Sequence, residues 1–179
     1  EQKWEDLARI NSAGKHLLSL VADVLDMSKI ESNNVDLKIE TFTLAGFVSD
    51  VRATAQALVA KNGNRLVVEC PPDAGEMKTD LTKLRQVALN LIGNAAKFTN
   101  KGTITLAVRR DRKGGVDWID LQILDTGIGI SEDQLSRLFQ NFGQASAATA
   151  GQYGGTGLGL AISRRFCTLM GGDITVASA

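Results

Sequence analysis

The segment from Asp80 to Thr99 most constrains what this chain can fold into, because it places two different faces side by side on one predicted helix. At about 100° per residue, its apolar side chains gather on one arc. This arc holds Leu84, Val87, Ala88, Leu91 and Ala95. A second arc immediately beside it holds Gln86, Asn90, Asn94 and Lys97. The helix must therefore bury one edge in a core and keep a polar edge next to that core.

Asparagine is a poor helix former, and a solvated helix face more usually carries Glu and Lys. Asn90 and Asn94 lie one turn apart beside the buried face, which indicates amide oxygens placed for a purpose. A neutral amide can ligate Mg²⁺ beside a polyphosphate, because it adds no repulsive negative charge. A polar helix edge that binds no ligand is the alternative interpretation.

Asp125 ends a run in which Ile119, Leu121 and Ile123 alternate as in a strand, and it continues their core-facing side. A carboxylate in that direction must find hydrogen-bond donors. The glycines two and four positions later let the backbone turn sharply and let a flat ligand approach closely. We interpret Asp125 as a receptor for an exocyclic amine such as that of adenine. An Asx turn at a strand end is the alternative.

The stretch GGTGLGLAI, residues 154–162, leads from a glycine-rich loop into an apolar helix. Backbone N–H groups in such a loop, with a helix N-terminus behind them, form an anion site suited to phosphates. The stretch lacks the Gly-Lys-Ser/Thr ending of a Walker loop, and no βαβ unit with a following acidic residue surrounds it. Residues 139–153, just upstream, have the small and polar composition of a mobile lid or of a disordered surface loop.

The whole pattern predicts one α+β domain, a two-layer α/β sandwich with a mixed sheet, preceded by one long N-terminal helix. The N-terminal helix is expected over residues 4–30, and other helices over residues 43 to about 61, 132–139 and 158–170. Strands are expected over residues 35–39, 65–70, 102–110, 116–124 and 173–178. The two strands joined around Gly114-Gly115 should be antiparallel. The narrow apolar stripe of residues 4–30 needs a partner helix, from an upstream region or from a second subunit.

Composition excludes several classes of protein. The chain carries 20 basic and 20 acidic residues, whereas a sequence-independent nucleic-acid binder shows a strong basic excess, so no nucleic-acid partner is expected. Cys70 and Cys167 lie far apart and are interpreted as reduced thiols of a cytoplasmic protein. No apolar run approaches the roughly 20 residues that span a bilayer. This segment should therefore make no membrane contact, although a longer protein containing it could be membrane-anchored.

Taken in order, four stretches resemble the ATP-binding module of sensor histidine kinases, within the superfamily of histidine kinases, gyrase, Hsp90 and MutL. LRQVALNLIGNAAKFT is similar to the N box, and DTGIGI is similar to the first glycine box. LFQNFGQ resembles the F box, with Asn141 where proline is common, and GGTGLGLAI resembles the second glycine box. The resemblance implies the Bergerat-type ATP-binding fold.

The same resemblance implies a division of the chain. Residues 1–33 would be the second helix of a dimerisation and histidine-phosphotransfer hairpin, which implies a homodimer. Residues 34–179 would be the catalytic ATP-binding domain, with its C-terminal strand truncated. His16 is the only histidine, but Leu17 follows it and no proline comes after, unlike a kinase acceptor. We interpret His16 as a surface helix residue and expect the acceptor histidine upstream. This segment would therefore contain no catalytic residue.

The site residues implied by the resemblance form one nucleotide site with ATP and Mg²⁺ as cofactors. Asn94 would be the principal Mg²⁺ ligand with Asn90 beside it, Lys97 would reach the phosphates, and Asp125 would accept the adenine amine. The other implied nucleotide contacts are Gly127, Gly129, Ile130, Gln144, Gly155, Thr156, Gly157, Leu158 and Gly159.

The implied function is transfer of the γ-phosphoryl group of ATP to a histidine on an upstream helix, for relay to an aspartate of a response-regulator receiver domain. Asn90 stands where hydrolytic members of the superfamily carry a glutamate that activates water, so intrinsic hydrolysis should be slow. Two alternatives from other classes remain. One is a nucleotide-binding regulatory module that signals by conformation, and the other is a hydrolytic ATPase, which Asn90 disfavours.

Overall fold

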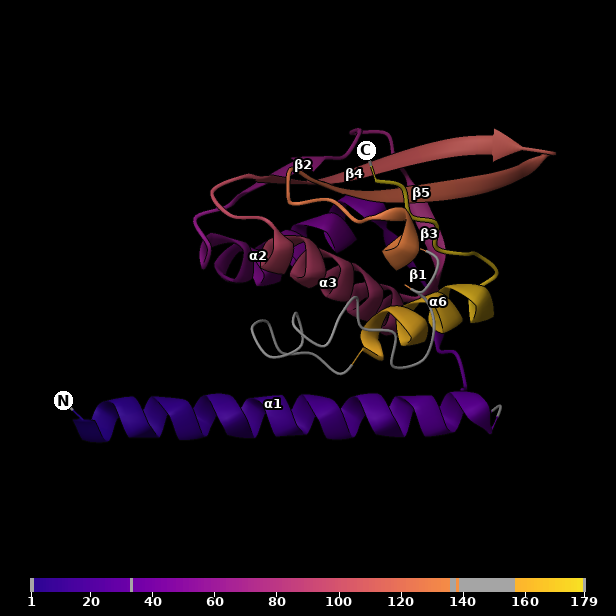
Figure 1. The fold of residues 1–179 in the computed structure, drawn as a ribbon. Coiled ribbons are helices and arrows are strands. Elements are labelled where there is room, and N and C mark those ends of the chain that lie inside the picture. Colours follow the sequence, from indigo (N-terminus) through magenta and orange to yellow (C-terminus); the bar gives the residue numbers. More distant parts are fainter. Residues whose placement is uncertain (1, 33, 136–137, 139–156, 179) are drawn as a thin grey trace.

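The computed structural model describes residues 2–32, 34–135, 138 and 157–178. Its helices are α1 (Gln2–Glu31), α2 (Leu44–Ala60), α3 (Leu81–Phe98), α4 (Glu132–Leu135) and α6 (Gly159–Leu169). Its strands are β1 (Ile39–Thr43), β2 (Arg65–Glu69), β3 (Glu76–Asp80), β4 (Thr103–Lys113) and β5 (Val116–Asp125). Helices α2, α3 and α6 lie on one side of the strands, and α1 runs beneath that helical layer (Figure 1). The predicted α+β sandwich is confirmed, and α1 coincides with the expected N-terminal helix.

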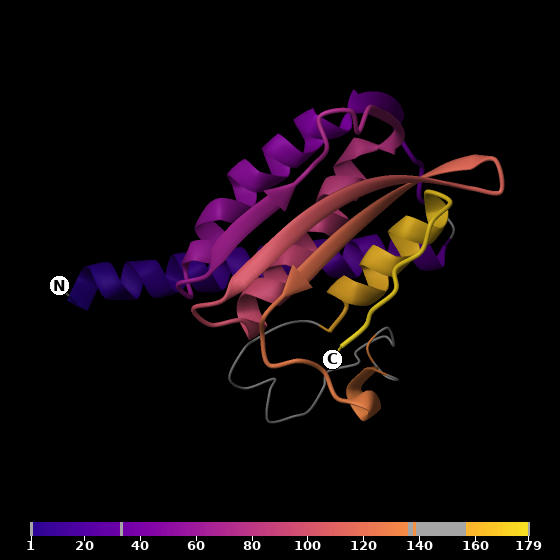
Figure 2. The same cartoon turned by 90° about the horizontal axis from the view of Figure 1, so that it is seen from above.

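The larger sheet is mixed, as predicted. β2 pairs with β4 in parallel, and β4 pairs with β5 in antiparallel orientation, with Lys113 opposite Val116 at the turn. Gly114 and Gly115 have φ values of 60° and 81°, and two-residue turns that match the strand twist require such positive values. β1 and β3 form a separate antiparallel pair. The β4–β5 hairpin projects beyond the helical layer (Figure 2).

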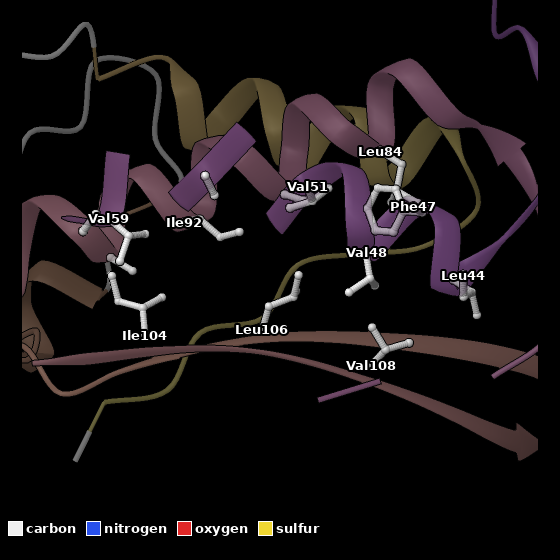
Figure 3. Close-up of a cluster of buried hydrophobic side chains, with 14 of the residues drawn as sticks. Leu44, Phe47, Val48, Val51, Val59, Leu84, Ile92, Ile104, Leu106 and Val108 are labelled. Carbon is white, nitrogen blue, oxygen red and sulfur yellow. The ribbon is translucent and has the colours of Figure 1, made fainter. Parts of the chain in front are cut away.

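The main core lies between β4 and the helices α2 and α3. Ile104, Leu106 and Val108 alternate along β4, are at most 1% exposed, and point toward the helices (Figure 3). The apolar arc predicted for α3 is buried, except that Leu91 is half-buried and Ile92 takes a fully buried place. Complete burial of one such side chain contributes about 1.5–3 kcal/mol. This packing fixes the rotation of α3, and hence the direction of its polar arc.

Local chemistry fixes where the helices begin. Asp80 is 4% exposed, and its Oδ1 accepts the Lys83 N–H at 2.9 Å, which caps α3. Its Oδ2 accepts the Lys38 N–H at 2.9 Å, so the same carboxylate holds the chain that leads into β1. Thr43 caps α2, because its hydroxyl accepts the Gly46 N–H at 3.2 Å. The predicted start of α2 at Thr43 is confirmed.

The last turns of α1 dock on α3 and α6 through a second, smaller cluster, in which Ile30 is 6% exposed. Beside it, Asp26 accepts a hydrogen bond from Gln86 Nε2 at 2.9 Å and lies 3.6 Å from Lys83 Nζ. Most of the apolar stripe of α1 is exposed, including Trp4, Leu7, Ile10, Leu17, Val21 and Val24. The partner helix expected for that stripe stays a prediction.

The strand predicted over residues 35–39 is wrong, since β1 covers Ile39–Thr43. The side chain of Asp80 takes the N–H of Lys38, so the backbone ladder with β3 begins only at Ile39. The sequence pattern also misses β3, because EMKTD shows no apolar alternation.

The strand predicted over residues 173–178 is also wrong, since that segment pairs with no strand in the described part of the chain. Asp173 instead accepts the Ile174 N–H at 2.8 Å and forms an ion pair with Arg164 at 3.0 Å. These contacts, chiefly the Arg164 hydrogen bond, lower the pKa of Asp173. The helix predicted over residues 132–139 is α4 over Glu132–Leu135, and residues 136–137 and 139 lie outside the described residues.

Across the described residues, no helix is both long enough and apolar enough to cross a bilayer.

Candidate functional site

Asp125 is the last residue of β5, and its carboxylate is bound on one side. Its Oδ1 accepts the Gly127 N–H at 2.9 Å and the Thr99 hydroxyl at 3.4 Å. Within the described residues no hydrogen bond reaches Oδ2. The expected donors are therefore present. The side chain lies on the core-facing side, as strand alternation predicts, because Asp125 pairs with Ile104, whose side chain points toward the helices (Figure 3). It is nevertheless exposed, since β5 ends at this residue.

The chain after Asp125 passes so close to the end of α3 that position 127 accommodates only glycine. A Cβ on Gly127 would lie 2.6 Å from the Phe98 carbonyl oxygen, 2.7 Å from Asp125 Oδ1 and 2.9 Å from Thr99 Oγ1. The Ile128 N–H donates to the same Phe98 carbonyl at 3.3 Å. This close approach holds the Asp125 carboxylate against the C-terminus of α3.

Asn90 faces α6. Its Nδ2 donates to the Ser163 hydroxyl at 2.8 Å, and Ser163 is 3% exposed. A Cβ on Gly159 would lie 2.7 Å from Asn90 Oδ1. Glycine at position 159 therefore allows the first turn of α6 to approach the polar edge of α3.

Asn94 and Lys97 continue the same edge of α3, and both are half-buried. Lys97 Nζ lies 5.1 Å from the centre of the Phe98 ring. Burial lowers the pKa of Lys97, because desolvation disfavours the charged ammonium. An anion beside the ammonium would act in the opposite direction and raise the pKa of Lys97.

The N-terminus of α6 follows Leu158, which is 3% exposed and packs in the same small cluster as Ile30 of α1. In the described structure no side chain caps this helix, and its first turn carries no acidic residue. Gly157, just before it, has a φ of 69°, a conformation that favours glycine. The first backbone N–H groups of a helix and its positive dipole end suit an anionic group.

These features lie in order along α3. Asn90 contacts α6, and Thr99, nine residues further, contacts Asp125. At a rise of about 1.5 Å per residue, the two contacts are roughly 13 Å apart along the helix axis. Asn94 and Lys97 lie between them. This arrangement suits an elongated ligand with an amine at one end and anionic groups at the other.

Two further predicted site residues lie beyond Asp125. Gly129 has a φ of 71°, so the turn after β5 requires the left-handed conformation that glycine adopts freely. The Ile130 N–H donates to the Ser178 hydroxyl at 2.8 Å, which places Ile130 beside the C-terminal segment. The predicted contacts Gln144, Gly155 and Thr156, the lid expected over residues 139–153 with Asn141, and the side chain of His16 lie outside the described residues.

Sequence reasoning missed three residues that support the site. Thr99 is 1% exposed, and its hydroxyl donates a hydrogen bond to Asp125. Asn64 is 8% exposed, and its amide donates to the Thr99 carbonyl. The Ser163 hydroxyl accepts a hydrogen bond from the Asn90 amide. Thr99 directly follows the polar arc, which was a usable signal. Asn64 stands beside the Asn62-Gly63 turn, and Ser163 stands in an apolar helix. Neither position shows its role without the tertiary contacts.

Fold and site together define an α+β sandwich in which the Asp125 carboxylate and the N-terminus of α6 lie along one edge of α3. Residues 79–179 match the family model described as histidine kinase-, DNA gyrase B- and HSP90-like ATPase, and the chain belongs to this family. With the relatives below, this match confirms the recognition of a catalytic ATP-binding domain of the sensor histidine kinase type.

The relatives include several named histidine kinases. The chain is 35% identical over 181 residues to the circadian input-output histidine kinase CikA of Synechococcus elongatus, covering 99% of this chain and 24% of CikA. It is 37% identical over 176 residues to the signal transduction histidine-protein kinase BarA of Escherichia coli K12, covering 97% of this chain and 19% of BarA. The full-length structure of ShkA in complex with AMPPNP matches with a TM-score of 0.76 and 29% identity, over 96% of this chain and 35% of ShkA. The chain thus spans a quarter or less of CikA and BarA.

Proposed function

We propose that this chain binds Mg-ATP along the polar edge of α3 and transfers the γ-phosphoryl group to a histidine on an upstream helix, for relay to an aspartate of a receiver domain. The observation that carries this proposal is the position of Asp125 and the α6 N-terminus at opposite ends of that edge. Family membership and the AMPPNP complex of ShkA support an adenine nucleotide as the ligand.

In this proposal Asp125 Oδ2 accepts the exocyclic amine of adenine, since Oδ1 is already engaged by protein donors. Gly127 and Gly129 shape the turn that borders the base. Lys97 and the first N–H groups of α6 bind phosphate oxygens, and phosphate charge offsets the desolvation of the Lys97 ammonium. The nucleotide then extends from its adenine at Asp125 toward its phosphates near Gly159.

The donors on α3 fit Mg²⁺ chemically, because this ion prefers oxygen ligands and keeps waters and substrate phosphates as its remaining ligands. Asn94 would hold it with its amide oxygen. Asn90 would assist through Oδ1, since its Nδ2 is committed to Ser163. A bound Mg²⁺ would neutralise charge on the phosphates.

Position 90 bears on the reaction type. An amide cannot take a proton from water at neutral pH, so the site should hold the triphosphate without splitting it quickly. We expect intrinsic ATP hydrolysis far below an ordinary enzyme turnover of roughly 1–10 s⁻¹. A turnover on the order of 1 s⁻¹ by the purified chain would instead favour the hydrolytic ATPase.

The proposal is tested by extending the chain with its upstream helix and incubating it with γ-labelled ATP and Mg²⁺. The expected product is an acid-labile, alkali-stable phosphohistidine that Asp125→Asn prevents. ATP binding without any phosphohistidine would overturn phosphoryl transfer and favour a regulatory module that signals by conformation.

We further propose that residues 1–33 form the second helix of a dimerisation hairpin and that the chain works in the cytoplasm as part of a homodimer. The exposed apolar stripe of α1 supports a helical partner for this segment. Light scattering on the extended chain tests the dimer. A monomer at micromolar concentration would contradict it.

A further inference from the structure

The Asp125 carboxylate is asymmetric in its bonding. Oδ1 accepts two hydrogen bonds, from Gly127 N–H at 2.9 Å and from Thr99 Oγ1 at 3.4 Å, and no described residue donates to Oδ2. The Gly127 bond closes a short local turn. The Thr99 bond is different, because it joins the end of α3 to the end of β5 across 26 positions of sequence.

Thr99 is itself held on both sides of its backbone. Its N–H donates to the Ala95 carbonyl at 3.0 Å, and its carbonyl accepts Asn64 Nδ2 at 2.8 Å. Glycine at position 102 lets the chain that enters β4 pack against the Thr99 side chain, since a Cβ there would lie 2.5 Å from Thr99 Cγ2. With 1% exposure, the hydroxyl has no access to water as a competing partner.

Asn64 uses its whole amide to build this frame. Besides Thr99, its Nδ2 donates to the Ala96 carbonyl at 3.2 Å, and its Oδ1 accepts the Gly102 N–H at 2.9 Å. It therefore ties the C-terminus of α3 to the chain that enters β4. The neighbouring Asn62 donates to the same Ala96 carbonyl at 3.0 Å, but its side chain makes no hydrogen bond to Thr99 or Gly102 in the described part of the chain.

We infer that Thr99, held by Asn64, is a positioning residue that selects for the amine of the ligand: it fixes Oδ1 of Asp125 toward the protein and leaves Oδ2 as the acceptor for an exocyclic amine. This inference rests on the proposed function, because it assigns the amine to adenine. An unrestrained carboxylate at a strand end would rotate, and the ligand would have to order it on binding. Thr99 supplies that order before binding.

The test compares ATP with purine riboside triphosphate, which lacks the 6-amino group. Thr99→Val keeps the shape and removes the hydroxyl, whereas Thr99→Ser keeps the hydroxyl. Calorimetry should show that wild type prefers ATP, that Thr99→Val loses about tenfold in affinity for ATP and little for the analogue, and that Thr99→Ser restores the preference. Asn64→Ala should reduce the preference, and its matched control Asn62→Ala should keep it.

A merely structural role for Thr99 would weaken both ligands equally and leave the preference ratio unchanged, which would overturn the inference. A Thr99→Val variant with the wild-type ratio would overturn it as well. If Thr99→Val does not fold, Thr99→Ala is compared with Thr99→Ser by the same ratio. Failure of wild type to bind ATP would refute the proposed function itself, whereas wild-type preference without any Thr99 effect would refute only this inference.

Discussion

Gly127→Ala should destabilise the protein, whereas the same substitution at Gly93 should stabilise it. At Gly127 the added Cβ would lie 2.6–2.9 Å from three oxygen atoms, of Phe98, Asp125 and Thr99. A shift of any of these atoms would disturb a hydrogen bond. The Phe98 carbonyl accepts the Ile128 N–H, and Thr99 Oγ1 donates to Asp125 Oδ1.

The two magnitudes follow from these surroundings. Crowding of this kind costs about 1–3 kcal/mol. Gly93 lies in the middle of α3, and the nearest atom to an added Cβ is Leu58 Cδ2 at 3.5 Å, an ordinary van der Waals contact. Alanine there should gain about 0.5–1 kcal/mol, because glycine loses more backbone freedom in a helix. The two variants should therefore differ in unfolding free energy by about 1.5–4 kcal/mol.

Urea unfolding of both variants, with the slope checked for constancy, measures these differences. Calorimetric titration with ATP measures the second effect, since displacement of the Asp125 carboxylate should weaken binding by Gly127→Ala at least about tenfold. Gly93→Ala should bind as wild type does. A Gly127→Ala variant as stable as wild type, or one with wild-type affinity for ATP, would refute the steric reasoning.

Asp26→Ala removes the acceptor of Gln86 and the ion-pair partner of Lys83, so docking of the last turns of α1 should weaken by about 1–2 kcal/mol. Faster amide exchange in those turns is the expected readout, and unchanged exchange would contradict it. Asp80→Ala leaves two backbone donors without their acceptor and should cost about 2–4 kcal/mol in urea unfolding, where a loss well below 1 kcal/mol would be contrary. Burial, followed by nearby negative charge, raises the pKa of Cys167 from 9.0 to about 11. The folded protein then keeps this proton where the unfolded chain has lost it, so stability should fall between pH 9 and 11 and level off above, and Cys167→Ala should lessen that fall.

Features that depend on local chemistry could be predicted from the sequence. The two arcs of α3 follow from the helical period alone, and Thr43 and Asp80 cap the helices that follow them. The Gly114-Gly115 turn supplies the positive φ values of a tight antiparallel hairpin. Each of these signals lies within a few residues of the structure that it specifies.

Features that depend on distant partners could not be predicted. β1 begins at Ile39 because Asp80, more than forty positions away, takes the Lys38 N–H. The segment at residues 173–178 alternates like a strand but has no strand beside it in the described chain. In the site, Asp125 and its glycines were predicted, but the hydroxyl of Thr99 that orients the carboxylate was not, since only the folded chain brings α3 and β5 together.

Ligand binding by the polar arc of α3 stays a prediction, and two residues of this arc also make contacts within the protein that the sequence does not indicate. Asn90 is predicted to contact the metal and the nucleotide, and the structure shows that its amide nitrogen also donates a hydrogen bond to the Ser163 hydroxyl of α6. Gln86 belongs to the same polar arc, yet it bonds Asp26 of α1. The arc therefore combines contacts that hold α1 and α6 with the proposed contacts to the nucleotide.

Calorimetric titration of Mg-ATP into wild type and into Asp125→Asn tests the adenine-binding assignment most directly. The asparagine keeps the shape of the side chain, but it removes the negative charge and replaces one acceptor oxygen by a donor. Because a hydrogen bond to a charged group is lost and a donor then faces the adenine amine, affinity should fall at least about 100-fold. A wild-type chain that binds Mg-ATP and an Asp125→Asn variant that does not are the predicted results, whereas affinity retained within about threefold would contradict the assignment of Asp125.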